Sequence, residues 1–426
     1  MRGGSGPFAN ADLCTQCGYC LPVCPTYRVE NNELHGPRGR VSLILALQSG
    51  AVTPAEAAAA LDHCLLCRAC HAACPAGVRP AKLALALRGQ VGPRPTVLSR
   101  LLHRITNSHR MTARLAGLLT SYQRSGLRHV VQRRGWLHHL PTLERLDALV
   151  PRQRSLFPLP PYPDAPSQAG RPRIGLLAGC IGRLFYLAVA PAAAQLLAQY
   201  GGEVILLGGF GCCGAPFRES GARQPFLRQA RRTLDAFVAA GPLQAVVCDS
   251  TVCAVTGRSY ARALDHDPAY AAVAEDFARK LHTLSQFLAG RLKRLTLTAK
   301  NPGFAAVTYH DHCQTRFGLG IIEEPRWLLA TLPMRYHELA PKDPFSSEGC
   351  CGAGGDYQLR HPERSQQIRT AKLAAIQASG AELVVGENPG CLLHIAAGLE
   401  QADSAVRVCH LAELLWAAYA QQQPTH

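Results

Sequence analysis

Two runs of four cysteines constrain this chain more than any other feature of its sequence. The runs CTQCGYCLPVCP and CLLCRACHAACP share the spacing C-x2-C-x2-C-x3-C-P. A structural zinc site uses two C-x2-C pairs and stops at four ligands, whereas this spacing is the bacterial ferredoxin run that holds [4Fe–4S] clusters. The sequence therefore predicts two cubane [4Fe–4S] clusters, with zinc as the alternative.

We do not expect these cysteines to form disulfides. The start, MRGGSGPFAN, lacks a charged segment followed by an apolar one, so we expect no signal peptide. No apolar run reaches the length of about 18 residues that would indicate a membrane-spanning helix. A chain without an export signal stays in a reducing compartment, where cysteine clusters more often bind metal.

The fourth cysteine of each run is expected to bind the cluster of the other run, as in two-cluster proteins of this type. Gly18 permits a close approach of the backbone to the sulfides. The set for cluster 1 is Cys14, Cys17, Cys20 and Cys74. The set for cluster 2 is Cys64, Cys67, Cys70 and Cys24.

The 39 residues between the two runs are too many for a minimal ferredoxin. They predict two helices, the second beginning with a capping box made by Thr53 and Glu56, with Pro54 at its first position. A helical ferredoxin domain follows from this. The stretch HGPRGR, from His35 to Arg40, is either a solvated turn or a shield for a cluster or a docking point for a partner.

Positive charge is concentrated in the middle of the chain. Residues 81–160 hold thirteen arginines and one lysine against two acids, in a protein of formal charge +16. This is either a solvated helical face or a docking surface for an acidic partner or anionic lipid headgroups. The segment lacks regular aromatic residues and any recognised nucleic-acid motif, so we expect no nucleic acid as a partner.

The second half of the chain repeats itself. GFGCCGA holds Cys212 and Cys213, and SEGCCGA holds Cys350 and Cys351, 138 positions later. Short apolar runs that resemble buried strands alternate with helical patterns, which predicts α/β units with parallel sheets. The cysteines come just past the predicted strands, where such sheets place their ligands.

Four cysteines in each repeat are therefore expected to converge on a metal centre, either zinc or an unusual iron–sulfur centre. Thiol–disulfide chemistry and a structural relic are the alternatives. The first repeat contributes Cys180, Cys212, Cys213 and Cys253. The second repeat contributes Cys313, Cys350, Cys351 and Cys391.

Other cysteines and histidines near these sets have no clear counterpart in the repeat. Cys248 aligns with a glycine of the second repeat, so it is either a fifth ligand or a small buried apolar residue. Cys409 is expected in the core. His310, His312 and His394 are expected to make ordinary polar contacts, with ligand roles as the alternative.

The predicted fold class is α+β and multidomain, with a helical two-cluster ferredoxin-type domain followed by two repeated α/β cysteine-rich (CCG) domains. The expected boundaries are a ferredoxin-type domain at 1–90, a basic helical segment and proline-rich linker at 91–168, the first CCG repeat at 169–300 and the second at 301–426.

The order of these motifs resembles a known family. CTQCGYCLPVCPTYRVENNELHGPRGR, the second cysteine run and two CCG domains are similar to the glycolate oxidase iron–sulfur subunit over nearly the whole chain. The resemblance implies a cytoplasmic or membrane-associated complex. In it, flavin-containing subunits would oxidise glycolate, or lactate, while this chain carries electrons away. The resemblance also implies that the eight amino-terminal cysteines are the cluster ligands.

The CCG domains also resemble those of the heterodisulfide reductase catalytic subunit and of the third subunit of anaerobic glycerol-3-phosphate dehydrogenase. In the first of these, the CCG cysteines bind a noncubane [4Fe–4S] centre and end in a C-x2-C pair. This chain has C-x4-C (Cys248 and Cys253) in one repeat and only Cys391, with Asn388 three residues before it, in the other. The metal of the CCG repeats therefore stays open.

The sequence predicts an electron-transfer subunit. A flavin on a partner would take two electrons from the 2-hydroxy acid, and the clusters would accept them singly and pass them to an acceptor such as quinone. No G-x-G-x-x-G follows a predicted strand, so we expect neither a flavin nor a catalytic residue on this chain. It would be cytoplasmic, or peripheral on the inner face of the membrane. The alternative is a heterodisulfide-reductase-like or anaerobic glycerol-3-phosphate dehydrogenase-type subunit with redox chemistry at the CCG site.

Overall fold

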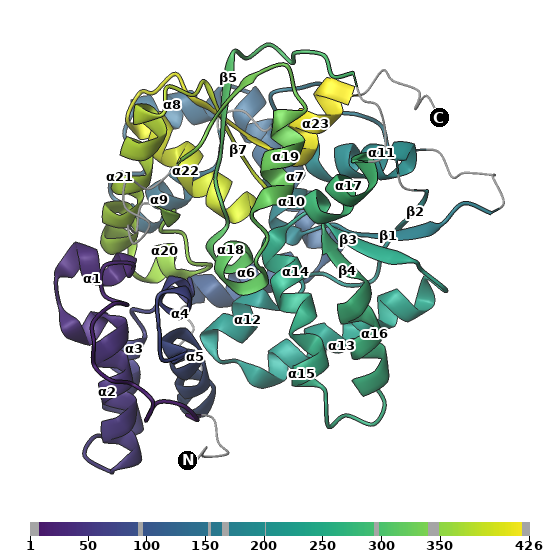
Figure 1. The fold of residues 1–426 in the computed structure, drawn as a ribbon. Helices are drawn as coiled ribbons and strands as arrows, with labels where there is room; N and C mark the ends of the chain where they lie inside the picture. The colour runs from purple at the N-terminus through teal and green to yellow at the C-terminus, as the bar shows by residue number, and fades with distance from the viewer. Residues whose placement is uncertain are drawn as a thin grey trace.

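The structure is a computed structural model that describes most of the chain (Figure 1). The described residues are 8–92, 97–151, 155–163, 170–200, 202–293, 298–339 and 349–419. The start of the chain, on which we base the expectation of no signal peptide, falls largely outside them, as does part of the predicted proline-rich linker. Among the described residues, no helix has both the length and the apolar character needed to cross a membrane.

The amino-terminal part is helical, as predicted. Thr53 and Glu56 form the expected capping box: the Thr53 side chain accepts from the Glu56 backbone, and the Glu56 carboxylate accepts from the Thr53 N–H. A small core that includes Ile44, Leu61 and Leu87 holds the helices together. The elements are α1 (Pro25–Glu30), η1 (Glu33–His35), α2 (Pro37–Gln48), α3 (Pro54–Leu61), α4 (Ala69–Ala72) and α5 (Pro80–Val91).

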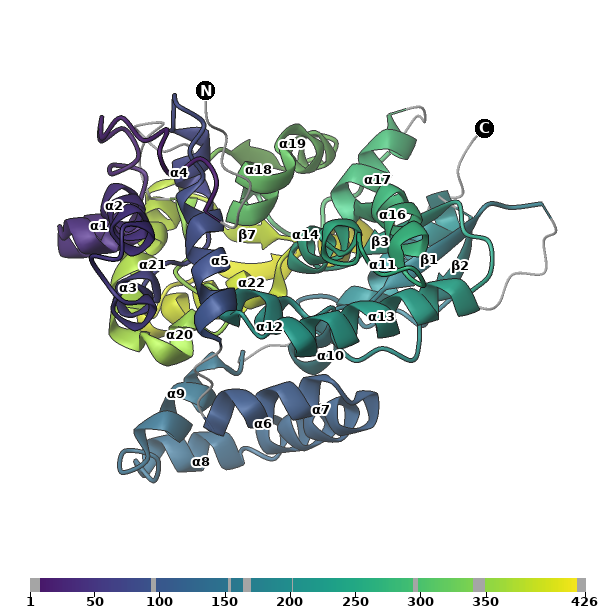
Figure 2. The same ribbon diagram turned by 90° about the horizontal axis from the view of Figure 1, so that it is seen from below.

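The basic middle segment forms a helical layer along one side of the molecule, as Figure 2 shows. Its four described helices are α6 (Val97–Thr106), α7 (His109–Arg124), α8 (Leu127–Arg133) and α9 (Pro141–Leu149). Arg128 is buried in it and donates to the backbone oxygen of Asp147 at 2.7 Å. The layer packs on both α/β units, through α7 against α10 and α9 against α22.

Two parallel four-stranded sheets follow, in the orders β2-β1-β3-β4 and β6-β5-β7-β8. The equal topology confirms the internal repeat and the predicted α/β units. The first sheet has β1 (Arg173–Leu177), β2 (Glu203–Leu206), β3 (Ala245–Cys248) and β4 (Leu281–Thr283). The second has β5 (Ala306–Tyr309), β6 (Arg335–His337), β7 (Leu383–Gly386) and β8 (Arg407–His410).

Helices cover both sheets. Those of the first unit are α10 (Cys180–Phe185), α11 (Val189–Tyr200), α12 (Ala215–Ser220), α13 (Arg223–Ala239), α14 (Thr251–Arg258), α15 (Tyr260–Ala263), α16 (Ala271–Lys280) and α17 (Leu284–Leu292). Those of the second are α18 (Cys313–Leu319), α19 (Glu323–Ala330), α20 (Tyr357–Arg360), α21 (Pro362–Ala378), α22 (Pro389–Gln401) and α23 (Leu411–Tyr419).

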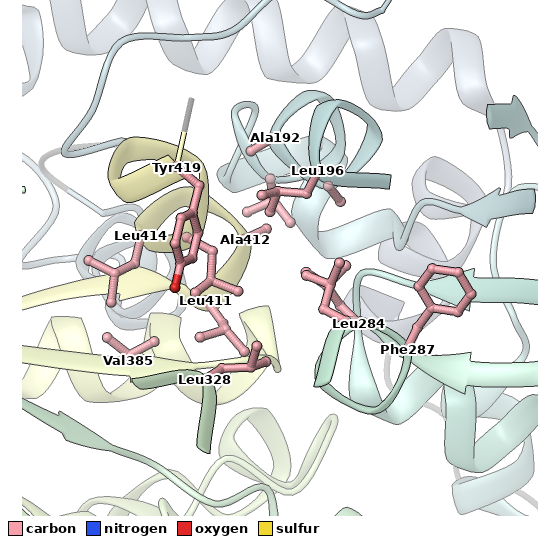
Figure 3. Close-up of a cluster of buried hydrophobic side chains, with 14 of the residues drawn as sticks. Ala192, Leu196, Leu284, Phe287, Leu328, Val385, Leu411, Ala412, Leu414 and Tyr419 are labelled. Carbon is pink, nitrogen blue, oxygen red and sulfur yellow. The ribbon is translucent and has the colours of Figure 1, made fainter. Parts of the chain in front are cut away.

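One apolar core joins the two α/β units (Figure 3). Leu196 of α11 and Leu284 of α17 pack with Leu328 of α19 and Leu414 of α23, and all four are fully buried. Each such leucine stabilises the interface by about 1.5–3 kcal/mol through burial alone. Cys409 lies in this core, as predicted. The two repeats are therefore held in one fixed arrangement, with their cysteine loops facing each other.

Candidate metal centres

The first cysteine run forms an open loop before α1. Gln16 and Gly18 have positive φ (59° and 85°), which bends the backbone tightly around the thiols. Burial, together with the nearby charges of Cys14 and Cys74, raises the pKa of Cys20 to about 11. The structure thus brings Cys74, from the second run, beside the first.

The second run is more deeply enclosed. Burial raises the pKa of Cys67 to about 12, with Cys24 as the next cause. The pKa of Cys70 is raised by burial and by the charges of Cys67, Cys64 and Cys24. Cys24, from the first run, therefore faces the second. Four converging thiols at each position are a donor set that suits an iron–sulfur cube, and the crossed ligand sets remain our prediction.

Arg40 supplies positive charge beside the second set, and the sequence left its role open. It is 3% exposed, and its Nη1 donates to Cys24 Sγ over 3.8 Å while Nη2 donates to Thr26 Oγ1 at 2.9 Å. Burial lowers the pKa of Arg40, but the thiolates of Cys64 and Cys24 outweigh it and raise the pKa overall. Within HGPRGR, Arg40 is therefore buried against Cys24 and not solvated, which favours the interpretation of a shield for a cluster.

A cavity of about 250 Å³ lies between the two α/β units. It is lined by the eight cysteines predicted from the repeat and by Cys67 of the ferredoxin part: Cys180, Cys212, Cys213, Cys253, Cys313, Cys350, Cys351, Cys391 and Cys67. Each repeat brings its cysteines there from behind strand ends, because all strands of both sheets are parallel. Neither the convergence of the two sets nor the presence of Cys67 follows from the sequence.

In the first repeat the thiols lie among backbone donors. Cys180 opens α10, and its Sγ lies 3.9 Å from Cys212 Sγ. The Gly214 N–H donates to Cys212 Sγ at 3.4 Å. Cys248 ends β3, is 1% exposed, packs in an apolar cluster and does not line the cavity. Its surroundings favour the interpretation as a small buried apolar residue.

The second repeat reproduces part of this geometry. The Gly352 N–H donates to Cys350 Sγ at 3.4 Å, as its counterpart does in the first repeat. Cys351 Sγ and Cys391 Sγ lie 3.0 Å apart and share a hydrogen bond, which lowers the pKa of Cys351 and raises that of Cys391. Asn388 Nδ2 donates to Cys391 Sγ at 3.5 Å.

Of the three histidines near the second set, two make the expected polar contacts. His312 Nδ1 bonds Thr315 Oγ1 at 2.8 Å, and His394 Nε2 bonds Ser365 Oγ at 3.0 Å. His310 differs, because it lies with Cys351 and Cys391 in a group whose ligand atoms are all within 4.8 Å of one another. For His310 the alternative of a ligand role gains support.

The cluster positions and the cavity are adjacent. The charge of Cys67 acts on the pKa of both Cys313 and Cys350. Arg88 fixes this contact: Nη2 donates to the Cys64 oxygen at 2.6 Å, and Nη1 donates to the Glu219 oxygen at 3.0 Å in the first repeat. Clusters held by the two amino-terminal cysteine sets would therefore lie next to each other, and the second would lie next to the cavity, an order that suits the transfer of single electrons.

Family models match most of this architecture. Residues 10–78 match the 4Fe-4S dicluster domain, 174–256 and 307–396 match the cysteine-rich domain, and 94–150 match the linker region of the glycolate oxidase iron-sulfur subunit. The basic helical layer thus belongs to the family's own architecture.

Curated relatives cover nearly the whole chain. The probable glycolate oxidase iron-sulfur subunit of Bacillus subtilis is 32% identical over 94% of this chain and 92% of its own length. The glycolate oxidase iron-sulfur subunit of Escherichia coli is 29% identical over 90% of this chain and 89% of its own. Lactate utilization protein A of Shouchella clausii is 31% identical over 57% of this chain and 98% of its own.

A solved structure shares the fold. The crystal structure of a hypothetical protein from Helicobacter pylori covers 94% of this chain with a TM-score of 0.51 and 10% identity, and the match spans 71% of that protein. At this identity the likeness concerns the fold alone. Sequence identity over the full architecture, by contrast, confirms the predicted resemblance: the chain belongs to the family of glycolate oxidase iron–sulfur subunits.

Proposed function

We propose that this chain is the electron-transfer subunit of a flavin-dependent 2-hydroxy-acid oxidase or dehydrogenase, with glycolate as the substrate of the complex. When bound, the two [4Fe–4S] clusters supply one-electron carriers between a two-electron flavin and the final acceptor. The chain itself holds the carriers in line, excludes water from the inner one and sets its charge environment. The flavin and the substrate pocket belong to partner subunits, and the electrons pass to a downstream acceptor such as a quinone.

One observation carries the proposal: the cysteines of cluster 1, those of cluster 2 and those of the CCG cavity lie next to one another in this order. The charge of Cys24, a predicted ligand of cluster 2, acts on Cys20 of cluster 1. Cys67 of cluster 2 in turn lines the cavity of the CCG cysteines. Cys17 is exposed while Cys70 is buried, so cluster 1 would lie nearer the protein surface and cluster 2 inside. We assign electron entry to cluster 1 for this reason.

The ligand sets predicted from the sequence are part of the proposal. Cluster 1 takes Cys14, Cys17, Cys20 and Cys74, and cluster 2 takes Cys64, Cys67, Cys70 and Cys24. The four cysteines of each CCG repeat hold a further metal. The proposal also includes the predicted domain boundaries and a location that is either cytoplasmic or peripheral on the inner face of the membrane.

Anaerobic purification with iron and sulfide analysis tests the proposal. About eight irons per chain are expected from two cubanes. Cys17→Ser should abolish the paramagnetic signal of one cluster and stop acceptor reduction, while substrate still bleaches the partner flavin. Cys409→Ser, in the apolar core, is the control and should keep both signals. Acceptor reduction that survives Cys17→Ser would remove cluster 1 from the route.

A second candidate function is thiol–disulfide chemistry at the CCG cavity. The 3.0 Å between Cys351 Sγ and Cys391 Sγ favours it, because two thiols this close can form a disulfide with little movement. Reduction of a disulfide substrate by the isolated chain would support this function, and Cys391→Ser should then abolish the activity.

A further inference from the structure

We propose that a basic cleft between the ferredoxin-type part and the first α/β unit binds a small organic phosphate that carries two or more negative charges. The cleft has a volume of about 750 Å³, and no cysteine lines it, so it is distinct from the cavity of the CCG cysteines. Sites for small molecules usually measure about 300–1,000 Å³. The site does not depend on the electron-transfer function proposed above.

Helices from two parts of the chain form the walls of the cleft. Lining residues come from α5 of the ferredoxin-type part and from α12, α13 and α15 of the first unit. Figure 1 and Figure 2 both place α12 between α5 and α13, and α12 packs against both. Part of the wall is apolar and buried, and consists of Leu66, Leu83, Phe226 and Leu227. Such a wall suits the organic part of a ligand.

The charged side chains of the cleft are almost all positive. Asp265 is the one acid among the lining residues, and its carboxylate lies 3.8 Å from His266 Nε2. The six cations that line the cleft are Arg68, Arg79, Lys82, Arg218, Arg223 and Arg262. Within the part of the chain that the structure describes, none of these six side chains makes a hydrogen bond or an ion pair. The cleft therefore has a positive charge that the protein itself does not neutralise.

The cations lie close enough to repel one another. The pKa of Lys82 is lowered by burial and then by four neighbouring cations: Arg79, Arg262, Arg68 and Arg218. Charges in solution at physiological salt act over about 10 Å, so these five cations lie within reach of one ligand. Like charges this close destabilise the folded chain, and a bound anion would remove that cost.

One further carboxylate acts on the cations without filling the cleft. The charge of Glu219 acts on both Arg68 and Arg218. Its side chain, however, accepts a hydrogen bond from Gln314 Nε2 at 2.7 Å, and Glu219 lines the CCG cavity instead of the basic cleft. The side of these cations that faces the cleft therefore stays open to an external anion.

Two helices add to the positive potential. The first turns of α5 and α13 line the cleft, and neither turn contains an acidic residue. Lys82 and Arg223 stand in these turns, at the positive end of the helix dipole, where a cation is unfavourable. Their charges therefore do not serve the stability of the helices, whereas both would attract an anion.

The kind of cation favours phosphate as the ligand group. Five of the six cations are arginines, whose planar guanidinium donates two parallel hydrogen bonds to a phosphate or a carboxylate. A phosphate monoester carries about two charges at neutral pH and a carboxylate only one, so phosphate matches the charge of the cleft in a smaller volume. An acidic segment of a protein partner would meet the exposed cations, but the buried apolar wall favours a small molecule.

Calorimetric titration of the anaerobically purified full-length chain with ADP, AMP and adenosine tests the inference, because these probes share one organic part and differ in charge. We expect ADP to bind more tightly than AMP, and adenosine not to bind. Arg218→Gln and Arg223→Gln should each weaken ADP binding about tenfold through the loss of one charge-assisted hydrogen bond. Arg228→Gln is the matched control, since Arg228 is an exposed arginine of α13 that does not line the cleft, and it should leave the affinity unchanged.

Thermal melting provides a second measurement. ADP should raise the melting temperature of the unaltered chain and raise that of Arg223→Gln less. Without ADP, Arg218→Gln should melt no lower than the unaltered chain, because the removed charge is repelled by its neighbours.

Four results would overturn the inference. They are adenosine binding as tightly as ADP, pyrophosphate binding as tightly as ADP, an equal loss of affinity in Arg228→Gln and Arg223→Gln, and no saturable binding of ADP. In the last case, a poly-glutamate peptide that binds the unaltered chain but not Arg223→Gln would assign the cleft to an acidic segment of a partner.

Discussion

Replacing Arg40 with glutamine removes a buried positive charge from the side of cluster 2. Arg40 Nη1 lies 3.8 Å from Cys24 Sγ, and we take about 6 Å as the distance between its charge and a cluster bound there for a Coulomb estimate. At an effective dielectric constant of about 20, a unit charge at that distance contributes about 3 kcal/mol. In the variant the added electron loses this attraction. If half to all of that energy acts on the reduced cluster, the potential of cluster 2 should fall by about 60 to 120 mV.

The assay is a redox titration followed by electron paramagnetic resonance on the anaerobically purified chain. Arg40→Lys keeps the charge and should shift the potential by less than half as much. Arg38→Gln makes the same charge change in the same motif, but its side chain is 31% exposed and pairs with Glu33, so solvent screens its effect. If Arg40→Gln shifts cluster 2 no more than Arg38→Gln shifts either cluster, the buried cation does not set the potential.

Three further changes test how the sites are supported. Arg88→Leu leaves four backbone oxygens without their donor, and a lower melting temperature should report a loss of about 3 kcal/mol. Burial raises the pKa of Glu413 from 4.5 to about 7, so the free energy of unfolding falls as pH rises across that range. Glu413→Gln removes this effect, and denaturant unfolding should show a free energy of unfolding higher by up to about 3 kcal/mol at pH 8 but little changed at pH 4. Gly39→Ala puts a methyl group 2.0 Å from the Glu33 oxygen and should lower the iron content, whereas Gly89→Ala meets nothing and should not.

The cysteine positions could be predicted because their information is local. The spacing within each run is a property of a few consecutive residues, so Cys14 and Cys64 can be named as candidate cluster ligands without knowledge of the rest of the fold. The repeated apolar runs predict the parallel sheets for the same reason, since a buried strand is a property of a few consecutive residues. Capping at Thr53 is equally local and is found as predicted.

Contacts between distant segments could not be predicted in this way. Cys67 lines the cavity with Cys313 and Cys391 only because Arg88 and the shared apolar core fix the parts against one another. The same holds for Arg40, whose motif is compatible with a solvated turn until η1 and α2 fold it onto Cys24. A single sequence does not reveal which segments more than two hundred residues apart will pack against each other.

The position of His310 can be predicted from the sequence, but its surroundings can be known only from the structure. Aligning the repeats places it opposite Leu177, so the replacement of an apolar side chain by imidazole can be read from the sequence. That difference alone has a plain explanation, because a buried histidine often bonds a neighbouring hydroxyl, as His394 does with Ser365. Only the structure shows that His310 has no such partner and that two thiols lie within reach. The two repeats thus share one backbone topology, while a single side chain changes which groups lie beside the cysteines.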